Sequence, residues 1–405
     1  MAQPANYQAY LESLFPNTTW EIQRLTGGLV NSTSRATKTS GTCKYDSVII
    51  KHARPYIECA GPEWAFSTDR QTIEAIVLEL WSESGLLYES RTSTPPWHIP
   101  QLIRHDRGKE SALKLNDSDL EASVITLLDL GKLVNIVQFL RAVAKTPSIA
   151  NDEQIAHIGS TVGQAFALTH SEETTKRILE NTETAQVLTH SMAESVVWKA
   201  AIEPVQERLA GRQNGQSLYD RIVQEWKSPK YETRTCFSLG DFTPGTVLLK
   251  DPSSGSSDLT PIIVDWEFAQ VNGHGVNGDI AQFLASICCE IISAKADSVL
   301  HALLLHFTTS FCVGYREAAK LHVKRAADDG NLQLLRSAFI MAGREIINQA
   351  HDVYGKSEYF QDMLDRGVWY VEHAGADMEE FIGDGNWAEI MKEEGLLLQS
   401  LFIQD

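Results

Sequence analysis

A single β-type interruption in a long helical series most constrains the fold of this chain. After residue 131, apolar residues recur mostly at helical spacing, as in 153–171, 217–228, 332–355 and 386–402. The series is broken by "FSLGDFTPGTVLLK" and "PIIVDWEFA", which are joined by the Ser/Gly-rich connector "DPSSGSSDLT". Such a short polar connector predicts an antiparallel hairpin, and no parallel βαβ unit surrounds it.

Strand-like segments cluster in the first third of the chain. "SVIIKHA" (47–53) and "ASVITLLDLG" (122–131) are apolar and β-rich, whereas residues 68–84 carry apolar side chains at helical spacing after a cap at Thr68 or Asp69. We therefore expect an α+β fold with two parts. A β-rich lobe would span residues 1–130, and a mostly helical lobe carrying the hairpin would span 131–405.

Composition narrows the class of partner. The 405 residues carry a formal charge of −18 at pH 7, which argues against nucleic-acid binding because phosphate contacts need clustered Lys and Arg. The N-terminus lacks the pattern of a secretory signal, and the apolar run 298–315 is interrupted by His301 and His306, which favours a buried helix over a membrane span. The six cysteines form no C-x-x-C pair, as expected in a reducing cytoplasm.

Residues 273–278 match the pattern G-x-G-x-x-G. A dinucleotide-binding fingerprint needs its first glycine directly after a strand and an acidic residue about 20 positions later. Here Trp266 to Asn272 separate the strand from Gly273. We interpret the glycines as a loop that ends at a helix cap, Asp279, and not as a nucleotide site.

The acidic strand end is more informative. Because side chains alternate along an extended strand, Asp265 and Glu267 should point the same way on either side of Trp266. Two converging carboxylates repel each other unless a cation lies between them, and oxygen ligands suit Mg²⁺. The alternative is an exposed strand end with two solvated acids.

Four other residues favour the metal interpretation. Asp241 precedes the hydroxyl of Thr246 by five positions, Lys51 lies alone in a β-rich segment, and Glu74 follows on the next helix. Phosphoryl transfer needs a carboxylate that accepts the proton of the attacking hydroxyl, metal ligands, and a cation at the phosphates. In this scheme Asp241 is the base, Thr246, Asp265 and Glu267 hold the metal, and Lys51 paired with Glu74 supplies the cation.

At these residues the sequence resembles the aminoglycoside phosphotransferase/choline kinase superfamily. "LGDFTPGTVLL" matches that family's H-G-D-x-x-x-x-N loop, with Leu239 at the His position and Thr246 at the Asn position, and "VDWEFA" matches its metal strand. The segments "RLTGGLVNSTSRAT" and "SVIIKHARPYI" look most like methylthioribose kinase and fungal hydroxytryptamine kinase. The resemblance implies a protein-kinase-like bilobal fold.

The same resemblance implies roles for further residues. Gly27, Gly28 and Asn31 would belong to the loop over the nucleotide phosphates, and residues 127–130, with Leu128 and Leu130, to the adenine hinge. Asp279 would tie down the catalytic loop. The cofactors would be ATP and Mg²⁺, and a homodimer is compatible with the family.

The acceptor is less constrained by the sequence. The twin-Arg pair of methylthioribose kinases is missing, since "AGREIINQAHDVYG" has Arg344 without an adjacent Arg, so another hydroxylated metabolite, from a secondary pathway, is expected. Trp198 and Arg344 are substrate candidates by residue type. The alternative hypothesis is a kinase-like fold kept for nucleotide or metabolite binding without phosphotransfer, motivated by Leu239 and Thr246.

Overall fold

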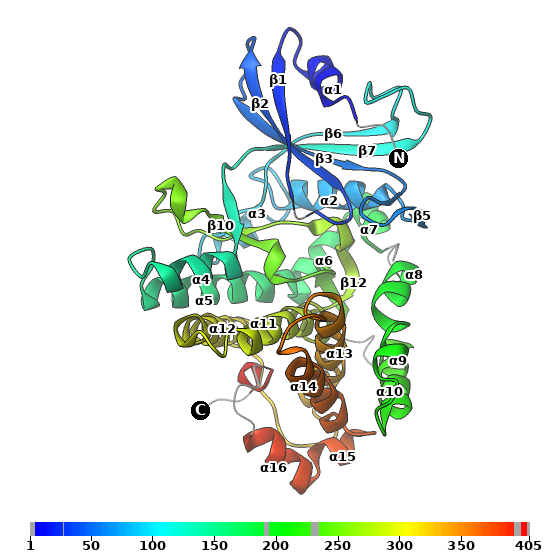
Figure 1. Ribbon diagram of the computed structural model, residues 1–405, viewed down its shortest axis with the longest axis vertical. Helices are drawn as coiled ribbons and strands as arrows, with labels where there is room; N and C mark the ends of the chain where they lie inside the picture. The colour runs from blue at the N-terminus through cyan, green and yellow to red at the C-terminus, as the bar shows by residue number, and fades with distance from the viewer. Residues whose placement is uncertain (1–4, 27, 190–193, 228–234, 393–397, 403–405) are drawn as a thin grey trace. The chain divides into compact units, whose positions relative to one another are not determined.

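The chain divides into two compact units. The computed structural model describes residues 5–26, 28–189, 194–227, 235–392 and 398–402 (Figure 1). The first unit comprises Met1–Tyr88, Ile99–Gly131 and Asp265–Phe268, and the second comprises Glu89–His98, Lys132–Val264 and Ala269–Asp405. Four residues from late in the chain therefore belong to the unit that the N-terminal segments build.

The first unit is built on a β-sheet. Its elements are α1 (Tyr7–Leu14), β1 (Thr19–Arg24), β2 (Ser32–Ser40), β3 (Ser47–Ala53), β4 (Tyr56–Ile57), β5 (Gly61–Ala65), α2 (Asp69–Leu80), β6 (Leu102–Lys109), β7 (Glu121–Leu128) and the 3-10 helix Trp266–Phe268. The short helix α3 (Tyr88–Thr92) crosses the division between the units. Five strands pair in the order β1-β2-β3-β7-β6, all antiparallel.

The central strand β3 carries Lys51. Opposite it, Thr33 of β2 and Ile125 of β7 fix its register. Most of β3 and β7 is buried, as the β-branched runs predict, and α2 packs against β6 and β7. Glu74 in the middle of α2 is buried with the apolar residues of that helix.

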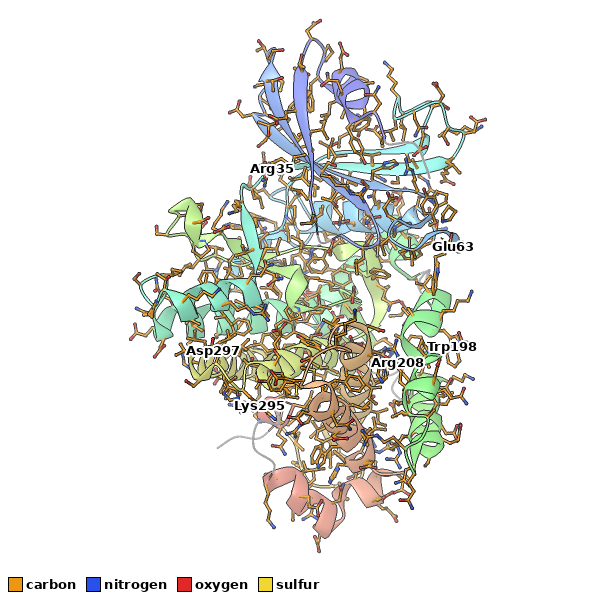
Figure 2. All side chains as sticks on the ribbon, viewed as in Figure 1. Arg35, Glu63, Trp198, Arg208, Lys295 and Asp297 are labelled. Atoms are coloured by element: carbon orange, nitrogen blue, oxygen red, sulfur yellow. The ribbon has the colours of Figure 1, made fainter. Side chains whose placement is uncertain are left out.

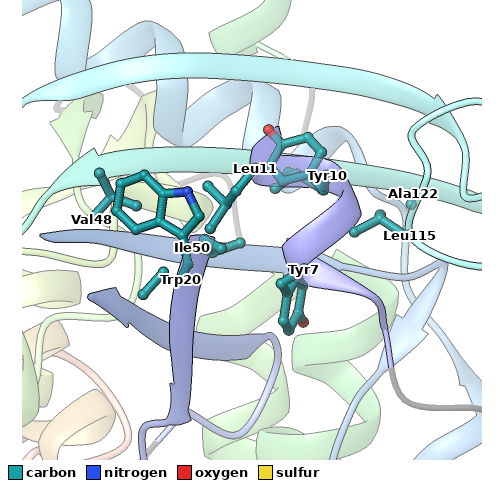
Figure 3. Close-up of a cluster of buried hydrophobic side chains, with 10 residues drawn as sticks. Tyr7, Tyr10, Leu11, Trp20, Val48, Ile50, Leu115 and Ala122 are labelled. Atoms are coloured by element: carbon teal, nitrogen blue, oxygen red, sulfur yellow. The ribbon is translucent and has the colours of Figure 1, made fainter. Parts of the chain in front are cut away.

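Helix α1 closes one face of this sheet. Its Tyr7, Tyr10 and Leu11 are buried in a cluster with side chains of the strands (Figure 3). That cluster includes Trp20, Ala36, Val48, Ile50, Leu115, Ala122 and Val124. The helix begins at an Asn6 cap, whose side chain accepts a hydrogen bond from the Ala9 amide.

The second unit is mostly helical. Its helices are α4 (Ile136–Lys145), α5 (Asp152–Thr169), α6 (Glu172–Glu180), α7 (Thr182–Thr189), α8 (Glu194–Val197), α9 (Val205–Arg208), α10 (Gly215–Lys227), α11 (Ala281–Ser293), α12 (Ser298–Ala319), α13 (Gly330–Asp352), α14 (Phe360–His373), α15 (Met378–Ile382) and α16 (Asp384–Lys392). Its strands are β8 (Leu133–Asn135), β9 (Thr235–Ser238), β10 (Val247–Lys250), β11 (Ile262–Ile263) and β12 (Gln270–His274). These two compositions confirm the α+β fold expected from the sequence.

The predicted hairpin is present and is antiparallel. Strand β10 pairs with β11 and, on its other edge, with β8. The interpretation of residues 273–278 as a loop is wrong, because Gly273 pairs with Cys236 within the β9–β12 ladder and Gly275–Ile280 form a π-helix. A side chain at Gly273 would collide with the Ser238 hydroxyl, so this glycine permits the close pairing of the two strands.

Two helical segments are long and apolar enough to be compared with membrane spans. They are Gly275–Ser293 and Ser298–Ala319, of which 78% and 50% are buried inside the protein. The second contains the run that the sequence predicts as a buried helix, and α12 packs against α5 over much of its length. This packing is typical of core helices.

Candidate active site

Lys51 joins two carboxylates in the first unit. Its Nζ lies 2.7 Å from Glu74 Oε2 and 2.6 Å from Asp265 Oδ1. The Lys51 and Glu74 side chains are almost fully buried, whereas half of the Asp265 side chain is exposed. The pairing of Lys51 with Glu74 expected from the sequence is thus present, and Asp265 completes it.

The charges of this cluster are unevenly balanced. Burial would lower the pKa of Lys51, but the carboxylates of Asp265, Glu74 and Glu267 outweigh burial and raise it above its ordinary value. Burial also raises the pKa of Glu74 to about 7, although Lys51 opposes this shift. Several carboxylates around one ammonium group leave excess negative charge.

The backbone brings Asp265 to Lys51 by a route that the sequence does not predict. Strand β11 ends at Ile263, Asp265 has φ of 64°, and Trp266–Phe268 form a 3-10 helix. The expected strand alternation of Asp265 and Glu267 is therefore wrong. A left-handed non-glycine residue is uncommon and is found at functional sites, where surrounding contacts maintain it.

Glu267 is held by a buried network. Its Oε2 accepts a 2.6 Å hydrogen bond from Asn31 Nδ2 and lies 3.6 Å from Arg70 Nε. Arg70 is fully buried, and it also donates to Asn31 Oδ1 at 3.0 Å and to the carbonyls of Phe66 and Tyr56. The network fastens the 265–268 segment to α2 and to the segment before β2.

The donor set suits a divalent cation. Burial raises the pKa of Glu267, and after the opposing Lys51, repulsion from Asp265 raises it further, so these two carboxylates are close enough to sense each other. Among the described residues, no three His, Cys, Asp or Glu side chains converge to hold a metal unaided. Mg²⁺ commonly takes one or two carboxylates together with substrate phosphates, and Asp265 with Glu267 would fit that pattern.

The second unit contains the loop 239–246 that carries Asp241. The Asp279 carboxyl group accepts hydrogen bonds from the backbone amides of Leu239, at 2.7 Å, and Gly240, at 2.9 Å. Asp279 therefore ties down this loop, as the family resemblance implies. The expected cap at Asp279 is wrong, since the residue lies inside the π-helix Gly275–Ile280.

A histidine from another helix supports Asp279. His170, which follows α5, places Nε2 3.1 Å from Asp279 Oδ2 and Nδ1 2.9 Å from the Tyr315 hydroxyl. A carboxylate accepts only, so the hydrogen bond to Asp279 places a proton on Nε2, and in a neutral imidazole Nδ1 would accept from Tyr315. Leu239 is fully buried, and His170 contacts Asp279, the residue that binds the loop amides.

Asp241 is bonded to α11. Gln282 Nε2 donates to Asp241 Oδ1 at 2.6 Å. The next loop residue, Phe242, is fully buried and stacks on Phe166 and Phe283 at centroid distances of 3.6 and 4.2 Å. The loop is thus anchored on both its backbone and its side chains.

Thr246 lies at the end of the same loop. Its hydroxyl donates to the Thr243 carbonyl at 2.9 Å, which leaves its oxygen lone pairs to act as acceptors. The metal ligands expected from the sequence are divided between the units: Asp265 and Glu267 belong to the first and Thr246 to the second.

Several residues that the sequence predicts to bind the nucleotide are engaged in contacts within the protein. Gly27 lies outside the described residues, Gly28 lies in an irregular segment, and Asn31 is buried against Glu267 and Arg70. Leu128 ends β7, where its amide donates to the Gln101 carbonyl. Between Leu128 and Leu130, Asp129 accepts two hydrogen bonds from Arg35 of β2, which fixes this segment to that strand.

The substrate candidates Trp198 and Arg344 occupy different environments. Trp198 begins the π-helix Trp198–Ile202 (Figure 2), is half-buried, and has Lys227 Nζ 5.0 Å from its ring centroid. Arg344 is buried on α13 and pairs with its neighbour Glu345 at 3.2 Å. Its role as a substrate ligand stays a prediction.

The sequence patterns did not predict the roles of Arg70, His170 and Gln282. Arg70 lies one helical turn before Glu74, and Gln282 lies three residues after Asp279, so spacing from a recognised residue could have indicated both. His170 is 109 residues from Asp279, and no local pattern connects them.

Comparison with solved structures finds phosphotransferases and small-molecule kinases to which this chain is similar. A Ralstonia eutropha structure provisionally identified as an aminoglycoside phosphotransferase is 11% identical, with a TM-score of 0.48 over 92% of this chain and 96% of that one. Plasmodium vivax ethanolamine kinase is 14% identical (TM-score 0.41, 88% and 81% covered), and Cryptosporidium parvum choline kinase is 10% identical (TM-score 0.43, 91% and 92% covered). No family model matches the chain, and neither does any curated protein. These TM-scores lie below 0.5, so a function can be inferred only from the side chains of this chain.

Proposed function

We propose that this protein is an ATP- and Mg²⁺-dependent phosphotransferase that moves the γ-phosphate to a hydroxyl group of a small metabolite. The observation that carries this proposal is Lys51 Nζ, held at 2.7 Å from Glu74 and 2.6 Å from Asp265. An ammonium group fixed by a buried carboxylate can contact nucleotide phosphates, while a half-exposed carboxylate beside it can accept a metal ion. Methylthioribose kinase and hydroxytryptamine kinase remain the relatives that the sequence predicts.

The chain's own residues divide the reaction. Asp241 accepts the proton as the acceptor O–H bond breaks, the acceptor oxygen forms the new bond to γ-phosphorus, and the bond to ADP breaks with its electron pair on the β-phosphate oxygen. Lys51 binds the phosphates, Glu74 orients Lys51, and Asp265, Glu267 and Thr246 would hold Mg²⁺. When bound, Mg²⁺ supplies positive charge to the phosphate oxygens.

Calorimetric titration with a non-hydrolysable ATP analogue tests the nucleotide site. We expect binding that depends on Mg²⁺ and is weakened at least about tenfold by Asp265→Asn, which removes a charged ligand without changing its shape. Asp119→Asn is the matched control, because its side chain is largely exposed beside Lys109 in the same unit. Equal binding with and without Mg²⁺, or equal loss in both variants, would contradict the assignment.

A screen of hydroxylated metabolites for ADP release then tests transfer. With an active acceptor, Asp241→Asn should reduce kcat by roughly 10²- to 10⁴-fold while leaving nucleotide affinity within about twofold. Unchanged turnover in this variant would exclude Asp241 as the base.

A second candidate is a kinase-like protein that binds nucleotide without transferring phosphate. It is favoured by Leu239, which is fully buried at the family's His position, and by Thr246 at the Asn position. Tight Mg²⁺-dependent binding with no phosphorylated product from any tested hydroxyl compound would favour this candidate.

A further inference from the structure

Three residues near the start of α11 contact four successive positions of the Asp241 loop. Asp279 binds the amides of Leu239 and Gly240, Gln282 binds the Asp241 carboxyl group, and the Phe283 ring lies nearly parallel to Phe242, with an interplanar angle of 6°. The loop is therefore aligned residue by residue with the start of α11. Nothing in the sequence motif of the loop assigns a role to Gln282.

Fixing the backbone of the loop does not by itself fix the Asp241 carboxyl group, which can still rotate about two side-chain bonds. The hydrogen bond from Gln282 Nε2, 2.6 Å long, restricts that rotation. Gln282 is partly buried and belongs to a helix, so it loses little further freedom when it holds the carboxyl group.

A neutral amide is chemically suited to a catalytic carboxylate. Its N–H stabilises the ionised form of the base without adding a positive charge, which would lower the pKa of the carboxyl group and weaken it as a proton acceptor. A Lys at this place would form an ion pair and weaken the base, whereas a Glu would compete with Asp241 for one proton. Titratable groups on this part of the unit include Asp279, which is bonded to the loop amides, His170 with Tyr315 behind it, and Cys236 and His274, which interact electrostatically with Asp279.

On the premise of the proposed phosphotransfer, we propose that Gln282 is a positioning residue that orients Asp241 and keeps it ionised as the base. Its contribution is made through Asp241 and not by contact with the nucleotide. Replacement should therefore reduce kcat and alter the pH dependence, and leave nucleotide affinity unchanged.

The test compares Gln282→Met, which keeps the length of the side chain and removes its donor, with Gln282→Glu, which keeps its shape and adds a competing acid. We expect kcat to fall by roughly 10- to 100-fold in both variants, with nucleotide affinity within about twofold of wild type. The acid limb of the pH–rate profile should move to higher pH in Gln282→Met and to still higher pH in Gln282→Glu. Gln164→Met on α5 is the matched control, since Gln164 Nε2 donates only to Ser160 among the bonds described for it.

A second measurement does not depend on turnover. In protein labelled with ¹³C at aspartate carboxyl carbons, the Asp241 signal is assigned by its loss in Asp241→Asn, and its titration midpoint is followed in each variant. A higher midpoint in Gln282→Met than in wild type supports the proposal. An unchanged midpoint, or loss of nucleotide binding and folding in parallel with kcat, overturns it.

These two measurements separate the possible failures. If no hydroxyl compound is phosphorylated by wild-type protein, the proposed function fails, while the ¹³C midpoints still decide whether Gln282 holds Asp241 ionised. If turnover is present and both the pH–rate profile and the midpoints are unmoved by the variants, only the role of Gln282 fails.

Discussion

Lys51 shows how a buried charge is retained in this protein. An isolated ammonium group would be costly to bury, but the carboxylates of Glu74 and Asp265 contact it directly and keep it charged. Glu74 has less compensation, because Asp265 and Glu267 repel its charge while Lys51 attracts it. The protonation state of Glu74 is therefore sensitive to pH near neutrality.

The raised pKa of Glu74 predicts how stability changes with pH. With a folded pKa of about 7 against an ordinary 4.5, the folded protein keeps the Glu74 proton longer than the unfolded chain does. This contribution to stability is full below about pH 4.5 and is lost as the pH rises through 7. Between pH 5 and 7.5, the unfolding free energy of the wild-type protein should fall by on the order of 2 kcal/mol because Glu74 loses its proton. In Glu74→Gln this fall should be absent.

Denaturant unfolding at the two pH values measures this difference. Glu79→Gln is the control, since Glu79 is exposed on the same helix. If wild type and Glu74→Gln lose the same free energy over this range, the raised pKa of Glu74 is wrong.

Residue types and spacing predicted the Lys51–Glu74 pair, because a strand followed by a helix packed on its sheet places few residues in reach of that lysine. The left-handed conformation of Asp265 was not predictable, since φ above zero in a non-glycine residue depends on contacts made after folding. Gln282 and His170 were missed for a related reason. Their partners lie 41 and 109 residues away, so a single sequence does not reveal the pairing itself, although the position of Gln282 three residues after Asp279 was a usable sign.

At the scale of elements, close packing of two helices positions His170. Three glycines lie where α5 and α12 approach each other: Gly159 and Gly163 of α5 and Gly314 of α12. A Cβ at Gly163 would lie 2.2 Å from the Phe311 carbonyl oxygen. The same two helices provide His170, just after α5, and Tyr315 of α12, which are 2.9 Å apart.

Gly163→Ala should therefore destabilise the protein. Alanine favours a helix over glycine by about 1 kcal/mol, but the clash is with backbone, which cannot rotate away, so we expect a net loss of roughly 1–3 kcal/mol. Gly385→Ala on α16 is the matched control: nothing lies within 4 Å of its added methyl group, and it should be neutral or slightly stabilising. Equal unfolding free energies in the two variants would show that α5 and α12 have room to separate.

Sequence periodicity predicted α5 as a helix, the interrupted apolar run predicted α12 as a buried helix, and the short polar connector predicted the hairpin β10–β11 as antiparallel. Periodicity did not predict the outcome for Gly273–Gly278, because a glycine gives no direct sign of what it packs against. Gly273 lies against Ser238, and Gly275 against His170 and Cys236, so both glycines serve close approach within the second unit.

At the scale of the whole molecule, the candidate residues are divided between two compact units. Asp265 contacts Lys51 in the first unit, and Asp241 contacts Gln282 in the second. In such a fold, stability and catalysis depend on different sets of contacts. Stability reflects contacts inside each unit, whereas the proposed phosphoryl transfer would require residues of both units to act on one nucleotide.

This difference predicts opposite behaviour of one double variant. For Asp265→Asn combined with Asp241→Asn, changes in unfolding free energy should add to within about 0.5 kcal/mol, because the two side chains have separate partners. The losses in kcat/KM should not multiply: the double variant should be at least about tenfold more active than the product of the single effects, since residues that serve one step cannot each be lost fully. Asp119→Asn combined with Asp241→Asn is the control pair, for which kcat/KM losses should multiply. Multiplying losses in the test pair would mean that Asp265 and Asp241 contribute independently, which would contradict their joint action in one transition state.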